Sequence, residues 1–93
     1  MTIHHSEDGS HGRFYLGDPA HPDAEMTYSR SSAHLIIIDH TEVDPSHRGE
    51  GLGDALVGEM VSWARASGTK VIPLCPFTKS RFDKQPVYRD VLA

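Results

Sequence analysis

The 93-residue sequence is poor in cysteine and in long apolar runs, and each shortage excludes a class of protein. Its one cysteine, Cys75, cannot form an internal disulfide and is typical of a protein that works in a reducing compartment. The longest apolar run, Leu35 to Ile38, is far too short to span a membrane, and the N-terminus lacks the basic and apolar regions of a secretory signal. We therefore expect a cytoplasmic protein with no membrane partner.

Positive charge is also scarce, with nine lysines and arginines against thirteen aspartates and glutamates. A strongly basic surface is the usual footprint of nucleic-acid binding, so we expect no nucleic-acid partner. Seven histidines are present, but no two have the i, i+4 spacing of a zinc-binding helix, so we expect no metal site. The length predicts one domain over residues 1–93, whose modest core favours an open cleft over an enclosed site.

The first half of the chain is typical of strands and turns. Alternating or β-branched residues predict strands over 2–6, 13–16, 24–30 and 34–43, separated by turn-forming and proline-containing segments. Three consecutive isoleucines, Ile36 to Ile38, indicate a central strand that is covered on both faces. We expect the strands of this half to form an antiparallel meander.

The second half begins with a helical pattern. Apolar residues recur every three or four positions from Leu52 to Ser67, and Gly68 is placed to cap the C-terminus of that helix. A strand over 70–74 and a short helix over 76–84 follow, whereas the form of 87–93 stays open. The order predicts an α+β fold: a mixed, mostly antiparallel sheet with a central parallel strand–helix–strand unit and a short C-terminal helix.

Three glycines, Gly49, Gly51 and Gly53, stand directly before the main helix and behind Arg48. Glycine adopts positive φ freely and lets a ligand approach the main chain, and the N-terminus of a helix attracts anions. The loop therefore predicts a phosphate-binding site, with a simple flexible turn as the alternative. Neither the P-loop nor the dinucleotide-binding pattern is matched. The small size of Gly53 suits close packing of the first helical turn against the strand.

The segment from Arg48 to Gly53, RGEGLG, matches the Arg/Gln-x-x-Gly-x-Gly/Ala signature of the GNAT superfamily of N-acetyltransferases. The preceding block 40–45 and the block 71–77 after the helix lie in the order found in that superfamily, and together the three resemble its small YjdJ-type branch. The resemblance covers almost the whole chain. One departure is Gln85, where relatives are expected to carry histidine.

This resemblance implies a minimal GNAT-like fold and acetyl-CoA (coenzyme A) as the cosubstrate. The diphosphate would lie on the glycine-rich loop, and the pantetheine arm would pair with the main chain of Glu42 and Val43, where two parallel strands splay apart. The second partner would be an amine acceptor, small or macromolecular, because the first 33 residues are too short for the helices that cover the acceptor side in larger relatives. The residues that the resemblance assigns to the cofactor are Glu42, Val43, Arg48, Gly49, Glu50, Gly51, Leu52, Gly53 and Asp54.

Cys75 and His40 are the candidate catalytic residues. A cysteine directly before a helix that starts with proline lies near N–H dipoles, which favour a thiolate that can accept an acetyl group. The alternative is a buried cysteine that acts as a small apolar side chain. Direct transfer would instead need a base such as His40 or Glu42, and Tyr88 could then protonate the leaving thiolate.

Three functions remain open at this point. The resemblance implies an acetyl-CoA-dependent N-acetyltransferase. A non-enzymatic CoA-binding or acyl-sensing module would keep the same loop and leave Cys75 in the core. A small partner-binding domain would use residues 24–30 as an exposed sheet edge. Lys79 and Lys84 are candidate phosphate contacts, or solvated side chains.

Overall fold

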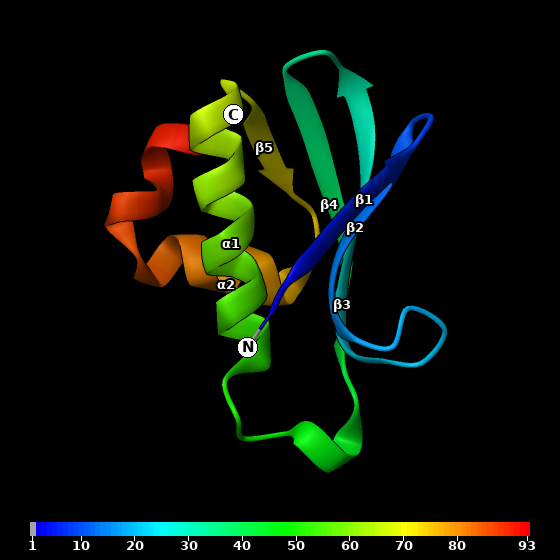
Figure 1. The fold of residues 1–93 in the computed structure, drawn as a ribbon. Helices are drawn as coiled ribbons and strands as arrows, with labels where there is room; N and C mark the ends of the chain where they lie inside the picture. The colour runs from blue at the N-terminus through cyan, green and yellow to red at the C-terminus, as the bar shows by residue number, and fades with distance from the viewer. Residues whose placement is uncertain (1) are drawn as a thin grey trace.

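A computed structural model describes residues 2–93 and places one layer of helices against a five-stranded sheet (Figure 1). The predicted main helix, second strand of the crossover and short helix all begin at the expected residues. The elements are, in chain order, β1 (His4–Asp8), β2 (His11–Gly17), β3 (Pro22–Ser32), β4 (Leu35–Val43), the 3-10 helix η1 (Pro45–His47), α1 (Leu52–Ser67), β5 (Lys70–Pro73), α2 (Pro76–Lys84) and the 3-10 helix η2 (Pro86–Val91).

The strands lie in sequence order, β1-β2-β3-β4-β5. The first four pair in antiparallel fashion, and β5 returns through α1 to pair with β4 in parallel. The mixed sheet with a parallel strand–helix–strand unit is therefore confirmed. The expectation that residues 24–30 form an exposed edge is wrong, because β3 pairs with β2 on one side and with β4 on the other.

Only one face of this sheet is covered by helices (Figure 1). Ile36 and Ile38 point toward them and are fully buried, whereas Ile37 is only half-buried on the other face. The expectation that this strand is covered on both faces is therefore wrong. The outer face is polar instead, with Thr27 and Ser29 of β3 both donating to the carboxylate of Asp39.

The core lies between the inner face of the sheet and the apolar stripe of α1. Strands β2, β3 and β4 contribute alternate residues, as expected for a sheet with one face exposed to solvent. The expected capping by Gly68 is confirmed: its φ is 68°, and the N–H of Thr69 donates to the Ala64 carbonyl at 2.8 Å. The buried residues of the helix are Leu52, Gly53, Leu56, Val57, Met60, Val61 and Ala64.

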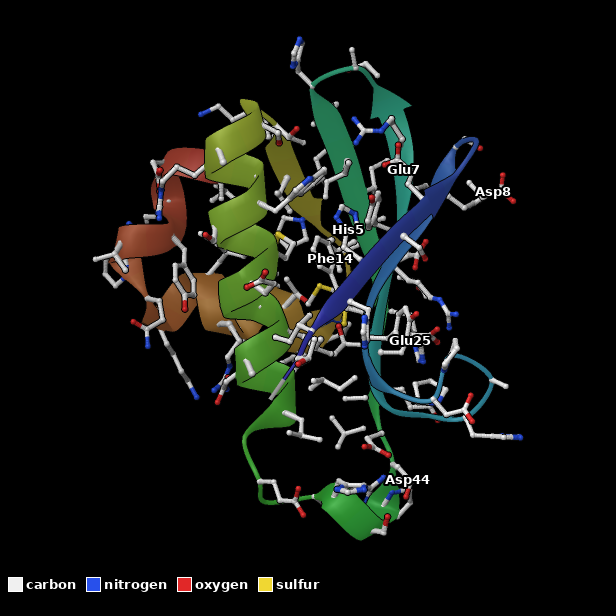
Figure 2. All side chains as sticks on the ribbon, viewed as in Figure 1. His5, Glu7, Asp8, Phe14, Glu25 and Asp44 are labelled. Carbon is white, nitrogen blue, oxygen red and sulfur yellow. The ribbon has the colours of Figure 1, made fainter. Side chains whose placement is uncertain are left out.

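An aromatic cluster closes the C-terminal half of α1 against the sheet. The ring of His5 stacks on Phe14 with centroids 4.0 Å apart and meets Trp63 edge-on at 4.8 Å. Its Nε2 atom lies 2.6 Å from the hydroxyl of the buried Tyr28. A Cβ on Gly12 would fall 2.3 Å from the Tyr28 ring, so only glycine leaves room for it. Figure 2 shows His5 and Phe14 between the sheet and α1.

The segment whose form the sequence left open becomes η2 and a final contact with the sheet edge. Leu92 bridges to Val71 of β5, and the N–H of Ala93 donates to the Val71 carbonyl at 2.9 Å. Arg65 of α1 pairs with Asp90 at 2.6 Å. The tail therefore covers the outer edge of β5 and connects this strand to α1.

Candidate active site

The pairing between the parallel strands β4 and β5 ends about halfway along β4. Their pairing runs only from Leu35–Lys70 to Ile38–Pro73, and the N–H groups of Leu74 and Cys75 both donate to the Ile38 carbonyl, at 3.0 and 3.1 Å. The chain then turns into α2, while β4 continues to Val43. Beyond Ile38, the side of β4 that faced β5 is therefore without a strand partner in residues 2–93.

A β-bulge at Asp39 decides which side chains of β4 face this gap. Thr27 pairs with His40 and Tyr28 with Ile38, so Asp39 is one residue extra on β4. The extra residue shifts the alternation beyond it. Thr41 turns inward, where its hydroxyl lies 3.3 Å from that of Thr78 on α2, and His40 turns to the exposed outer face.

His40 and Glu42 form a pair on that outer face, with Nε2 and Oε2 3.4 Å apart. The N–H of Asp44 donates to the Asp23 carbonyl at 2.8 Å, which sets the alternation of main-chain groups along this part of β4. The main chain of Glu42 accordingly faces β3. That of Thr41 and Val43 faces the vacated side, where an extended ligand can pair with it.

The loop after β4 is held in place by a small polar network. The Asp44 carboxylate accepts hydrogen bonds from the N–H of Ser46 at 3.0 Å and from its hydroxyl at 2.6 Å. His47 lies 3.0 Å from a Glu50 oxygen and 3.4 Å from an Asp23 oxygen. The bond to Glu50, reinforced by the surrounding carboxylates, raises the pKa of His47. His47 therefore links η1 to Asp23 at the start of β3.

Gly49 and Gly51 lead the chain into α1, which begins without a cap from the described side chains. Gly49 and Gly51 have φ values of 86° and 77°, and a Cβ at either position would meet no atom within 4 Å. No side chain of residues 2–93 caps the start of this helix, and its first hydrogen bond is from the Ala55 N–H to the Gly51 carbonyl at 3.0 Å. The preceding N–H groups, those of Leu52, Gly53 and Asp54, thus have no acceptor in the described part of the chain.

A hollow of about 200 Å³ opens over these amides. It brings together most of the residues that the sequence assigned to the cofactor, and it adds His47 of η1 and Phe77 of α2, which sequence reasoning missed. A Cβ on Gly53 would fall 2.7 Å from the Phe77 ring, so Gly53 makes room for α2 and not, as expected, for the strand. The lining residues are Val43, His47, Arg48, Gly49, Gly51, Leu52, Gly53, Asp54 and Phe77.

Cys75 lies at the point where β5 ends and α2 begins, and it is the N-cap residue of α2. Its side chain is buried, with 5% of the residue exposed. Burial by itself raises the pKa of the thiol, but hydrogen bonds from the Thr41 hydroxyl and from the Thr78 and Phe77 N–H groups favour the thiolate, and the net pKa is lowered. The geometry is that of a helix N-terminus acting on a sulfur.

Not every candidate residue comes to the same place. His40 lies on the outer face, whereas Cys75 lies at the inner side of the sheet, at the N-terminus of α2. The ring of Tyr88 packs against Phe82 with centroids 6.1 Å apart, beside α1 and α2. Lys79 pairs with Asp83 at 3.3 Å. None of these four candidate residues lines the 200 Å³ hollow over the amides.

Two negative findings apply to residues 2–93. None of their helices has the length and the apolar character needed to cross a membrane. No group of three or more histidine, cysteine, aspartate or glutamate side chains among them is arranged to hold a metal ion.

Comparisons with known proteins agree with this geometry. Residues 13–91 match a family described as GCN5-related N-acetyl-transferase. A GCN5-like protein from Staphylococcus aureus, solved by NMR, is 33% identical with a TM-score of 0.76, and the match covers 97% of this chain and 87% of that one. No curated protein sequence matches the chain.

Two longer enzymes share the fold at low sequence identity. A ribosomal-protein-alanine N-acetyltransferase from Brucella melitensis is 17% identical with a TM-score of 0.63, over 92% of this chain and 64% of that one. GCN5 from Tetrahymena is 12% identical with a TM-score of 0.66, over 84% of this chain and 51% of that one. The present chain thus spans only about half to two-thirds of their length.

The resemblance stated from the sequence is confirmed at the level of the superfamily, while the YjdJ-type branch stays a prediction. The extent of the family match, together with the S. aureus relative at 33% identity, leads to one conclusion. The chain belongs to the GCN5-related N-acetyltransferases, and it is an acyltransferase.

Proposed function

We propose that the chain transfers the acetyl group of acetyl-CoA to an amine. The observation that carries this proposal is the row of N–H groups without acceptors at the start of α1, next to a hollow that continues toward the free side of β4. Such a row attracts phosphate, because the amides and the helix dipole both favour negative charge. The cosubstrate that the family commonly uses carries a diphosphate and an extended amide-containing arm, and the two features suit these two parts of the site.

The donor is placed along these features in order. Its diphosphate lies on the amides between Gly49 and Asp54, with Arg48 adding positive charge at the rim. Its pantetheine arm follows the vacated side of β4 and pairs with the main chain of Val43 and Thr41. The acetyl group then lies where β4 and β5 part, beside the buried Cys75.

The transfer proceeds through Cys75 in two steps. The thiolate attacks the acetyl carbonyl, a new carbon–sulfur bond forms, and the CoA thiolate leaves. The neutral amine then attacks the enzyme thioester, the Cys75 thiolate is released, and the proton of the amine passes to solvent, because His40 lies on the opposite face of the sheet from Cys75. Burial of Cys75 protects the thioester from water, and the lowered pKa of its thiol favours the thiolate.

The amine approaches over the outer face of the sheet, because the helices occupy the other face (Figure 1). In place of further helices, β1 and β2 are joined by a tight hairpin turn, which leaves this side open to a small or a macromolecular acceptor. A hollow of about 270 Å³ on this face contains the carboxylates of Glu25, Glu42 and Asp44. Their charge suits the ammonium group that an amine carries at neutral pH.

Calorimetric titration with acetyl-CoA tests the donor site. A Gly51→Val substitution should weaken binding roughly tenfold or more, because a β-branched residue is strained at this positive φ and hinders access to the amides. Gly9→Val is the matched control, since Gly9 also has positive φ and open space but lies in the distant β1–β2 turn. Binding weaker than roughly millimolar by the unchanged chain, or equal weakening by both substitutions, would contradict the proposal.

Intact-mass measurement after incubation with acetyl-CoA tests the chemical step. We expect one added acetyl group that is lost when an amine is supplied, and no added group in Cys75→Ala. The burial of Cys75 also favours a second candidate function, an acyl-sensing module that binds CoA without transfer. Tight CoA binding with neither an acetylated protein nor an acetylated amine would establish that second function.

A further inference from the structure

Arg81 of α2 lies beside the proposed donor site and takes no part in the functions assigned so far. Its Nη1 atom is 3.3 Å from a carboxylate oxygen of Asp54, and its Nε donates to the Ser80 hydroxyl at 3.3 Å. The guanidinium lies over the ring of Phe77, 5.1 Å from its centroid. Three contacts thus hold the group, while Nη2 makes no hydrogen bond with the residues that the structure describes.

Asp54 stands between Arg81 and the free amides. It is the acidic residue in the first turn of α1, where its charge interacts favourably with the helix dipole. It lines the 200 Å³ hollow over the amides, and it also lines a neighbouring hollow of about 160 Å³ together with Arg81. One carboxylate therefore separates the phosphate-binding amides from a fixed cation.

This arrangement poses an electrostatic problem for the donor. A diphosphate on the amides brings negative charge close to the Asp54 carboxylate, and the two repel each other. A cation within reach of both would remove the repulsion. Arg81 is suited to this because its side chain is three-quarters covered and its planar fork can face two anions at once, whereas Arg48 is exposed and has no ion pair in residues 2–93.

We propose that Arg81 is a binding residue for the diphosphate of the donor and that it bridges this group to Asp54. The inference rests on the proposed use of acetyl-CoA. Phe77 and Ser80 keep the guanidinium in place when the diphosphate arrives, so Arg81 shares its N–H groups between the two anions. Asp54 is then a residue that weakens donor binding, and Arg81 is one that strengthens it.

The test compares four variants by titration with CoA and with dephospho-CoA, and follows the thermal midpoint of each. Arg81→Gln should weaken binding of both ligands roughly tenfold or more, since charge-assisted hydrogen bonds to phosphate are lost. Asp54→Asn should tighten binding by about threefold, in line with a partly screened charge. Arg81→Lys, which keeps the charge without the fork, should lie between. Arg89→Gln removes one positive charge from exposed η2 and should stay within about twofold of the unchanged chain.

Opposite signs for Arg81→Gln and Asp54→Asn support the inference. Equal weakening by the two would show that the pair only braces α2 against α1, and it would overturn the inference. So would a loss for Arg81→Gln no larger than that for Arg89→Gln, or a loss seen with CoA and absent with dephospho-CoA. If the unchanged chain fails to bind either ligand, the proposed donor itself is overturned, whereas all the other outcomes concern Arg81 alone.

Discussion

The two ends of α1 are built in opposite ways. At the C-terminal end, Gly68 caps the helix, the Ser67 hydroxyl donates to the Trp63 carbonyl at 2.8 Å, and the aromatic cluster packs over the last turns. At the N-terminal end, none of the described side chains caps the helix, and Gly49 and Gly51, where a Cβ would meet no atom within 4 Å, precede it. Figure 2 shows the contrast in His5, which lies between sheet and helix, and Asp44, which lies beside the loop.

The difference predicts that residues important for stability and residues important for donor binding lie at opposite ends of α1. At the N-terminal end, the N–H groups of Leu52, Gly53 and Asp54 have no acceptor in residues 2–93. An unpaired amide is unfavourable when buried, so such a row is tolerated where water or a ligand can reach it. Substitutions at the C-terminal end should therefore change the free energy of unfolding, and substitutions at the N-terminal end should change donor binding.

The largest expected effect is at the aromatic cluster. Gly12→Ala places a methyl group within 2.3 Å of the buried Tyr28 ring and should lower the free energy of unfolding by about 3 kcal/mol, with CoA affinity unchanged in the folded protein. Chemical denaturation measures it. Gly58→Ala in the interior of α1 is the control: its nearest contact is 3.7 Å away, and it should stabilise by about 0.5–1 kcal/mol. Destabilisation by both substitutions would mean that the clash with the Tyr28 ring is not the reason for the loss of stability in Gly12→Ala.

Gly53→Ala tests whether the N-terminal end of α1 affects binding alone, because Gly53 both packs against Phe77 and lines the proposed donor site. Its methyl group would fall 2.7 Å from the Phe77 ring, which lines the donor hollow. We expect a loss of about 1–2 kcal/mol in stability together with weaker CoA binding. Denaturation and titration of the same sample measure both quantities. Unchanged CoA affinity would show that Phe77 does not shape the donor site.

Gly68→Ala tests whether the C-terminal end of α1 affects stability alone. A methyl group meets no atom there, but the φ of 68° is unfavourable for alanine and should lower stability by about 1 kcal/mol. CoA affinity should not change, since the residue lies at the far end of α1. A measurable change in affinity would argue that the two ends are coupled.

The smallest expected effects are on the pH dependence of stability. His5, near the C-terminal half of α1, and His47, before its N-terminal end, should contribute with opposite sign. Burial lowers the pKa of His5, so the unfolded chain takes up a proton first and stability falls as the pH drops below the ordinary histidine value. The pKa of His47 is raised by its bond to Glu50, so its contribution is complete below the ordinary value and is lost as the pH rises through the higher folded-state pKa.

Thermal midpoints across pH 5–8 measure both contributions. His5→Gln should flatten the low-pH side of the profile, and His47→Gln should flatten the high-pH side. Swapped effects, or none from either substitution, would contradict the assignment of the two histidines to the two ends.

Local sequence patterns were sufficient for much of the fold. The bounds of α1 and α2 follow from the spacing of apolar residues and from Gly68 and Pro76, because a helix is stabilised by contacts within a few residues. The glycine-rich loop was found in the same way, since positive φ and an uncapped helix start are properties of adjacent residues. The local pattern was insufficient to predict which faces of a strand are covered. Ile37 was expected to be covered, but it is only half-buried.

What only the tertiary structure decided are the relations between distant residues. The bulge at Asp39 turns His40 away from Cys75, and it arises from pairing with β3, not from the β4 sequence alone. Gly53 meets Phe77, and Asp54 meets Arg81 across 27 positions, only because α2 folds back over the start of α1. Such contacts depend on the packing of whole elements, so no local pattern encodes them. The sequence by itself determined a glycine-rich loop with positive φ before a helix, and the packed fold decided which side chains surround it.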